Sequence, residues 1–324
     1  MMNILTRTPS LRGRPVSAVI LLISVFALIG APYLFDAYGV GLLTEALILG
    51  LWAMSLNVLA GQTGLISLGH AGTLGVSAYT SAWLQSNQGW SFVPASLAAI
   101  AAACVISVLF ALTASRSSGV YFILVTLAQG MLVWGIVQRW SSVTGGDNGL
   151  RGGGVPDGLS KYWAFYWFTL VVVLLSLIIL RLLDRGSVGL RLRGTRESAL
   201  RMSALGYSVD GERFKAFVLS GLFAGVAGVL FVGHFQFISP STVHVSSSVE
   251  VLLMVIIGGM GSFLGPMVGA VVLVMGRAFI TSYTERWHLV MGAILVLMVL
   301  FAPDGLVGRM SAFGKRRPAP SVSR

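Results

Sequence analysis

The chain has 324 residues, of which 56% are hydrophobic and only 10% are charged, and its formal net charge is +11. Soluble domains have about a quarter of their residues charged, so this composition excludes an ordinary soluble protein. It also argues against nucleic acid as a partner, because the Lys and Arg residues stand at the ends of apolar runs instead of covering one soluble face. The single cysteine, Cys104, excludes a disulfide within the chain.

Apolar runs recur along the chain and predict an all-α polytopic membrane protein with about ten transmembrane helices. We expect a cytoplasmic segment at 1–15, a transmembrane domain at 16–302 and a basic, disordered cytoplasmic tail at 303–324. The expected spans are 16–34, 40–60, a third that follows the stretch 61–75 and ends near 84, 93–114, 120–137, 163–183, 216–235, 249–257, 267–282 and 288–301. The eighth and tenth are shorter than the roughly 20 residues of a full crossing, so we expect them to be tilted, broken or re-entrant.

The distribution of positive charge orients these spans. With both termini in the cytoplasm, internal segments hold seventeen Lys and Arg residues, and external segments hold only Arg139, Arg151, Lys161 and Arg286. This asymmetry follows the positive-inside rule. We therefore expect both termini to be cytoplasmic.

The longest polar stretch, Arg181–Lys215, is predicted to be a cytoplasmic loop, with its core at 184–214. Thr195 is expected to cap a helix of about three turns that ends at Gly206. The helix would pair Glu197 with Arg201 across one turn. Its apolar face would consist of Ala199, Met202 and Leu205. An exposed amphipathic helix of this kind is suited to docking into a groove of a partner protein.

The residue inventory argues against an enzyme. The sequence has no GxxxxGK[ST] phosphate-binding loop and no HExxH motif, and its four histidines are too scattered for metal-ligand spacing. The stretch Thr144–Gly149 resembles the GxGD motif of membrane aspartyl proteases only loosely, because Thr144 stands where the first glycine is required. We expect no catalytic residue, no metal site and no bound cofactor in this chain.

Two glycine-rich stretches, 61–75 and 258–269, are predicted to interrupt helices at membrane depth. Broken helices are tolerated where they line a cavity, and their free amides can hold a carboxylate. The candidate pathway residues are Gln62, Ser67, Gly69, His70, Gly258, Gly259 and Gly261. The alternative is that glycines at GxxxG spacing only let helices pack closely, as at Gly221 and Gly225 and at Gly261, Gly265 and Gly269.

Three charged residues, Glu45, Glu250 and Arg277, lie in or near expected spans. A charge inside a membrane is expensive, so each is expected to face the protein interior, a partner or water. One interpretation is a structural ion pair between Arg277 and one of the glutamates; the other is a funnel for the substrate.

Five sequence stretches together resemble the LivM-type permease subunits of branched-chain amino acid ABC importers. They are GQTGLISLGHAGTLGVSAY, GVYFILVTLAQG, TGGDNGLRG, the long stretch from Arg185 to Phe231, and IGGMGSFLGPMVGA. They occur in the family order, and the resemblance covers most of residues 40–305. It implies a multi-pass protein of the bacterial inner membrane, in contact with lipid.

The resemblance also implies partners. These are a second, LivH-like permease subunit, two ABC ATPase subunits that use the ATP, and a periplasmic substrate-binding protein. The cytoplasmic helix would then couple this chain to an ATPase through Arg196, Glu197, Ala199, Arg201, Met202, Leu205 and Gly206. Ser203 departs from an alanine that is common in the family, which leaves the docking role intact.

Several alternatives remain open. The same class of ABC permease could carry urea, another small amino acid or an amide. An ion-coupled secondary transporter would need acidic residues near the middle of the membrane, and such residues are scarce here. A scaffold or receptor without transport is disfavoured only by the resemblance.

Overall fold

The computed structural model describes residues 30–283, 286, 289–290, 292–294, 296 and 305–306. The N-terminal segment 1–15, most of the first expected span and of the tenth, and nearly all of the tail lie outside the described residues. The described part is a bundle of helices with one two-stranded ribbon. The prediction of an all-α polytopic membrane protein is confirmed.

Five helical segments of the described part are long and apolar enough to cross a membrane. They match the second, fourth, fifth, sixth and seventh expected spans. Their bounds are Ala37–Thr63, where α2 (Ala37–Asn57) continues as the π-helix η2 (Val58–Thr63), then α4 (Phe92–Ala114), α5 (Gly119–Arg139), α7 (Tyr162–Arg185) and α10 (Val209–Phe235).

The third expected span begins earlier than the sequence suggests, inside the glycine-rich stretch 61–75. The π-helix ends at Gly64, whose φ of 76° places it in the left-handed region that favours glycine. Residues 64–69 then form no helix, and α3 runs from His70 to Gln88. Because α3 is rich in small and polar residues, it does not meet the same test of length and apolarity, although most of its residues are buried.

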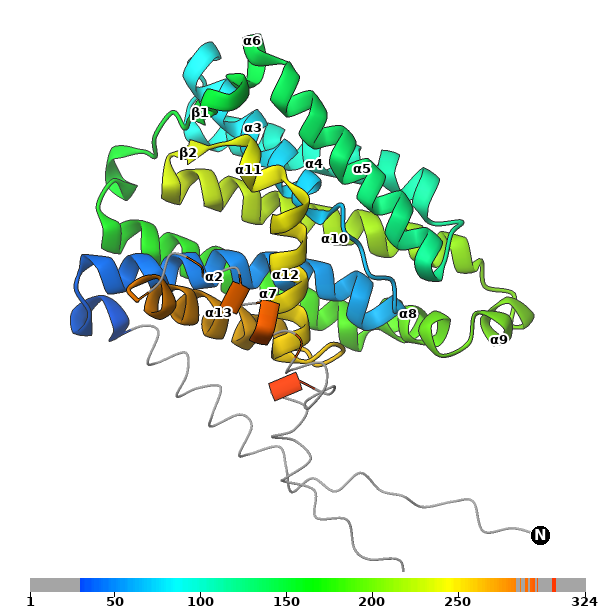
Figure 1. Cartoon of the computed structure of the whole chain (residues 1–324). Coiled ribbons are helices and arrows are strands. Elements are labelled where there is room, and N and C mark those ends of the chain that lie inside the picture. The colour runs from blue at the N-terminus through cyan, green and yellow to red at the C-terminus, as the bar shows by residue number, and fades with distance from the viewer. Residues whose placement is uncertain are drawn as a thin grey trace, which may run out of the picture.

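Two shorter apolar helices follow, α12 (Val245–Gly258) and α13 (Gly265–Thr281). The 14 residues of α12 span about 21 Å, which is less than the hydrocarbon core of about 30 Å. The helix is short, as the short apolar run suggests, and whether it is tilted or re-entrant in the membrane stays a prediction. Figure 1 shows α12 crossing the neighbouring helices at a steep angle, with the four-residue α11 (Pro240–Val243) leading into it.

The two ends of the bundle differ. At one end, here named the ribbon end, β1 (Leu150–Arg151) pairs antiparallel with β2 (Phe237–Ile238). The short helices around it are α6 (Ser141–Thr144), η3 (Gly146–Asn148) and η4 (Asp157–Leu159). At the opposite end, the basic end, lie α8 (Ser187–Glu197) and α9 (Ala199–Ala204) (Figure 1).

Glycines bring several helices close together. A Cβ at Gly221 or Gly225 of α10 would overlap Ser107 or Ala103 of α4. A Cβ at Gly269 of α13 would overlap the Met254 carbonyl of α12. The close-packing interpretation of these GxxxG glycines is confirmed. Gly261 itself lies in the turn before α13, with a φ of 85°.

Candidate functional site

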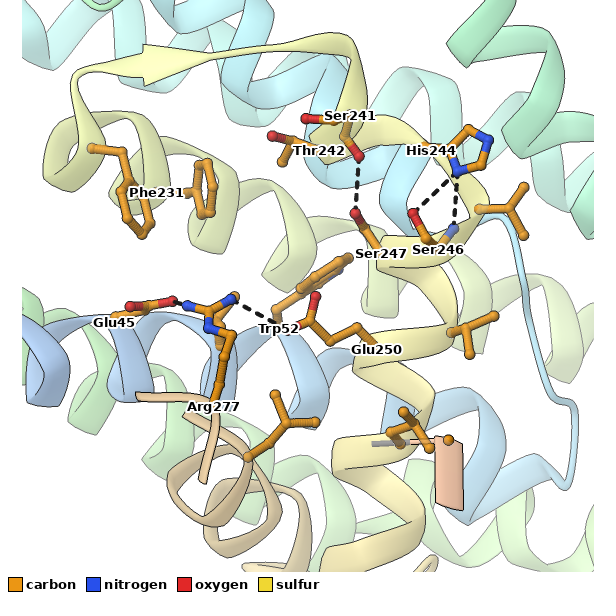
Figure 2. Close-up of a pocket in the computed structure, with 17 residues that line it drawn as sticks. Glu45, Trp52, Phe231, Ser241, Thr242, His244, Ser246, Ser247, Glu250 and Arg277 are labelled. Carbon is orange, nitrogen blue, oxygen red and sulfur yellow. Dashed lines mark hydrogen bonds and ion pairs between the residues drawn. The ribbon is translucent and has the colours of Figure 1, made fainter. Parts of the chain in front are cut away.

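A cavity of about 740 Å³ lies between α10 on one side and α2 and α13 on the other, in the half of the bundle nearer the ribbon end (Figure 2). The segment from α11 to α12 forms its remaining wall. Much of its lining is apolar, from Leu49, Trp52, Phe231, Phe235, Val245, Val249, Leu253 and Leu273. A cavity of this size suits a small molecule.

All three membrane charges line this cavity. Arg277 forms an ion pair with Glu45 of α2, and its Nη1 lies 3.5 Å from a carboxylate oxygen of Glu250 on α12. Figure 2 shows both carboxylates directed toward the Arg277 guanidinium. The expected ion pair is therefore present as a three-residue cluster. Since the cluster also lines the cavity, the structural interpretation and the substrate interpretation apply to the same residues.

Hydroxyl groups line the cavity beside this charged cluster. Ser246 Oγ lies 3.1 Å from Nδ1 of His244, and Ser247 Oγ donates a hydrogen bond to the Ser241 carbonyl over 3.1 Å. These residues and Thr242 all line the cavity. The sequence places this stretch between the seventh and eighth expected spans and assigns it no role. Its density of serine beside a charged, apolar helix was the signal that could have marked it.

The first glycine-rich stretch lies behind the cavity wall. A Cβ at Gly69 would overlap the Thr126 carbonyl of α5, and the Leu68 amide donates to the Thr126 hydroxyl over 3.1 Å. Ser67 is fully buried. His70 Nε2 lies 2.8 Å from Ser55 Oγ. The His70 ring also stacks on Trp52, which itself lines the cavity.

Neither glycine-rich stretch contributes to the described cavity lining. Of the candidate pathway residues, Gln62, Ser67, Gly69, His70, Gly258, Gly259 and Gly261 are all absent from it. A Cβ at Gly258 would overlap the Gly265 backbone, and Gly259 adopts a φ of 109°. In this structure these glycines serve close approach of backbone to backbone, and their place on a substrate pathway stays a prediction.

The two glycine-rich stretches meet each other at the basic end. The Asn57 amide nitrogen donates to the Ser262 carbonyl over 3.1 Å, and its oxygen accepts from the Gly261 amide over 3.3 Å. Arg196 Nη1, from α8, donates to the Gly61 carbonyl over 2.5 Å. We name these five residues, Asn57, Gly61, Arg196, Gly261 and Ser262, the clasp. The clasp joins α8 to the end of α2 and to the turn between α12 and α13.

A second polar group lies beside the clasp. Asp184 accepts from Arg193 over 2.5 Å and from Arg181 over 3.3 Å, and the Gln62 amide donates to the same carboxylate over 3.3 Å. Gln62 is therefore tied to the basic loop. Its side chain fixes the π-helix to the end of α7.

The predicted coupling helix is wrong in its extent. Thr195 lies inside α8, and its hydroxyl donates to the Leu192 carbonyl over 2.7 Å. Ser198 is the N-cap instead, because its hydroxyl accepts from the Arg201 amide over 3.2 Å. The result is a six-residue helix, so Glu197 and Arg201 do not share one. The predicted end is confirmed, because Gly206 follows the helix with a φ of 86°.

The predicted apolar face of that helix is also divided. Met202 is buried against Gly194 of α8, so it packs within the chain. Leu205 is 73% exposed, Ala199 is partly buried, and Leu200, which the predicted face left out, is 83% exposed. The error follows from the helix start. Once α9 begins after Ser198 and folds back on α8, Met202 faces α8 and the exposed leucines are at 200 and 205.

Comparisons with known proteins identify the family of the chain. The profile of the family described as "Branched-chain amino acid transport system / permease component" matches residues 38–299. The chain is 30% identical to the high-affinity branched-chain amino acid transport system permease protein LivM of Escherichia coli (strain K12), over 92% of this chain and 77% of the relative. The LivM protein of Salmonella typhimurium is similar to the same degree and over the same shares.

A related permease gives a shorter match. The LivH protein of Salmonella typhimurium is 30% identical over 45% of this chain and 47% of the relative. No solved structure matches the chain significantly. Because the family profile matches most of the chain, the chain belongs to the family of permease components of branched-chain amino acid transport systems.

Proposed function

We propose that this chain is a permease subunit of an ABC importer in the bacterial inner membrane and that it carries branched-chain amino acids. It works with a LivH-like second permease subunit, two ABC ATPase subunits and a periplasmic substrate-binding protein. The partner ATPases use the ATP, and this chain binds no cofactor. The observation that carries the proposal is the family match along residues 38–299, which include the whole cavity lining.

The chemistry of the cavity supports this class of substrate. A branched-chain amino acid joins an aliphatic side chain to a zwitterion with one ammonium and one carboxylate group. The cavity offers an apolar wall of Leu49, Leu253 and Leu273 beside carboxylates, a guanidinium and hydroxyl groups. Partly buried charges of both signs offset the free-energy cost of bringing a zwitterion out of water.

The proposal includes the orientation of the chain. Both termini and the basic loop 184–214 are cytoplasmic, the ribbon end is periplasmic, and about ten spans make up the domain at 16–302. The cavity then lies nearer the periplasm, where a binding protein would deliver the substrate. After Cys104→Ala, a single cysteine at Asn148 should react with an impermeant thiol reagent in intact cells, and one at Arg193 should not. The reverse pattern would overturn this orientation.

We propose that the ATPase binds at the basic end and that its conformational change is transmitted to the permease there. Supporting this role, α9 presents Leu200 and Leu205 to the exterior, and α8 carries Arg196 into the clasp. Because the clasp joins α8 to α2 and to the turn before α13, a displacement of α8 would move helices that form the cavity wall. The coupling residues are Arg196, Glu197, Ala199, Leu200, Arg201, Leu205 and Gly206, with Met202 holding α9 on α8.

Reconstitution tests the function. The chain is purified with its second permease and both ATPases, placed in liposomes with ATP inside, and supplied with its binding protein outside. We expect uptake of radiolabelled leucine that requires hydrolysable ATP. If the complex takes up urea and no leucine, the proposed substrate is wrong and urea takes its place. If leucine uptake needs an ion gradient and no ATP, the ABC mechanism is wrong and the chain is an ion-coupled secondary transporter.

A further inference from the structure

The two glutamates of the charged cluster are held unequally. Glu45 is the closer partner of Arg277, and its side chain is only 10% exposed. Glu250 is 3.5 Å from the guanidinium, at the limit of a hydrogen bond, and its side chain is 21% exposed. The described residues give Glu250 no other ion pair. One carboxylate is thus closely paired, while the other keeps room for a further donor.

The position of Glu250 on α12 matters as well. Residues three or four positions apart share one face of a helix, so Ser246, Ser247, Glu250 and Leu253 form one stripe, and all four line the cavity. The hydroxyl groups lie on one side of the carboxylate and the leucine on the other. Leu49 and Leu273, one helical turn from Glu45 and Arg277, also line the cavity.

This order matches the order of groups in an amino acid. The charged groups of a branched-chain amino acid are attached to one carbon, and its aliphatic side chain extends from that carbon. With its ammonium group at Glu250, its carboxylate would lie among Arg277 and the hydroxyl groups, and its side chain would lie along Leu253. An ammonium group is a charged donor, and hydrogen bonds between charged groups are stronger than those between neutral groups, so it suits an incompletely paired carboxylate in a membrane.

We infer that Glu250 binds the α-ammonium group of the transported amino acid, while Glu45 acts as a positioning residue that fixes Arg277. The inference rests on the proposed function and adds to it a division of labour between the two carboxylates. Glu250 acts on the substrate, and Glu45 acts through the guanidinium. Glu45 pairs more closely with Arg277 than Glu250 does, so the position of the guanidinium is attributed to Glu45.

The test uses the reconstituted importer with its binding protein. Glu250→Gln keeps the shape of the side chain and removes its charge, and Glu250→Asp restores the charge. We expect Glu250→Gln to lower leucine uptake by at least about tenfold, while the yield of the complex, its melting temperature and its binding-protein-stimulated ATP hydrolysis stay near wild type. Glu250→Asp should recover part of the uptake. Glu45→Gln is the matched control and should lower the melting temperature of the complex.

Two results would overturn the inference. Leucine uptake by Glu250→Gln at the wild-type rate would remove Glu250 from the pathway. A lower melting temperature in Glu250→Gln, equal to that in Glu45→Gln and without rescue by Glu250→Asp, would make the whole cluster structural. Failure of the proposed function is distinguishable, because the wild-type complex itself would then take up no leucine.

Discussion

The clasp and the cavity both lie between α2 and the α12–α13 region, but the helices are in close contact at the clasp and apart at the cavity. At the clasp, Gly61 and Gly261 let segments approach so closely that one asparagine side chain reaches two backbone groups across the gap. At the cavity, aromatic and charged side chains such as Trp52 and Arg277 line an open space between the same elements. The difference teaches that glycine-rich breaks in this protein mark where the helices meet. Membrane charges mark where they separate.

The largest expected effect tests the packed side of this comparison. Gly69→Leu should prevent formation of a folded complex, because even a Cβ there would overlap the Thr126 carbonyl. We expect a loss of about 3 kcal/mol of stability, visible as loss of the monodisperse peak in size-exclusion chromatography of the detergent-solubilised complex. Gly135→Ala on α5 is the control, since a Cβ there meets nothing within 4 Å. A Gly69→Leu complex that assembles and hydrolyses ATP but does not transport would restore Gly69 to the pathway.

The next largest effect is expected at the exposed leucines of α9, which are proposed to bind the ATPase beside the clasp. Replacing Leu200 and Leu205 together with Asp should abolish co-purification of the ATPase, because it removes about 3 to 5 kcal/mol of apolar burial and places charge in the groove. Membrane insertion should be unchanged. The control is Met202→Leu, a swap of similar volume at the buried position facing α8. Normal ATPase retention by the double variant would reduce the basic loop to a topology signal.

A smaller effect is expected inside the clasp. Arg196→Ala removes a charged hydrogen bond to the Gly61 carbonyl, which contributes about 1.5 to 3 kcal/mol. The variant should retain its ATPase but move less leucine per ATP hydrolysed, because α8 would no longer be tied to α2. The ratio of leucine uptake to phosphate release in proteoliposomes measures this. An unchanged ratio would show that the clasp is not needed for coupling.

The smallest effect is expected one turn earlier. Arg193 pairs with Asp184, but its side chain is 41% exposed, so Arg193→Ala should change stability by no more than about 1 kcal/mol. Uptake and ATP hydrolysis should stay close to wild type in the same assay. If Arg193→Ala lowers leucine uptake per ATP hydrolysed as much as Arg196→Ala does, the Asp184 group is also needed for coupling.

The parts of the fold that were predictable from sequence follow from local signals. The bounds of α4, α5 and α7 lie close to the ends of apolar runs. Helix α10 ends with its apolar run but begins at Val209, ahead of the expected start at 216. The start of α3 was missed, because His70 lies inside the glycine-rich stretch 61–75, which the sequence predicts to interrupt helices. The start of α9 was missed because Thr195 and Ser198 are both good capping residues, and tertiary packing of Met202 on α8 favours the second.

For the functional residues too, local sequence signals predict some features, and others depend on tertiary packing. The sequence identifies the membrane charges, because their burial is costly wherever they lie. It suggests an ion pair between Arg277 and one of the glutamates, but it does not show that both carboxylates meet the guanidinium, because that depends on how α2, α12 and α13 pack together. Nothing local in the sequence places the serines at 246 and 247 on a cavity wall, since they precede the expected span at 249–257.

The composition of α3 has a consequence for how the protein is made. A newly synthesised segment enters the bilayer by itself when it is sufficiently apolar, but α3 carries serines, threonines and glutamine that are buried only by later neighbours. Ser77 of α3 donates to the Gly225 carbonyl of α10, which is synthesised almost 150 residues later. Until α10 has been synthesised, the polar side chains of α3 lack these hydrogen-bond partners. During biogenesis α3 must therefore be held beside α4 or by the insertion machinery until α10 packs against it.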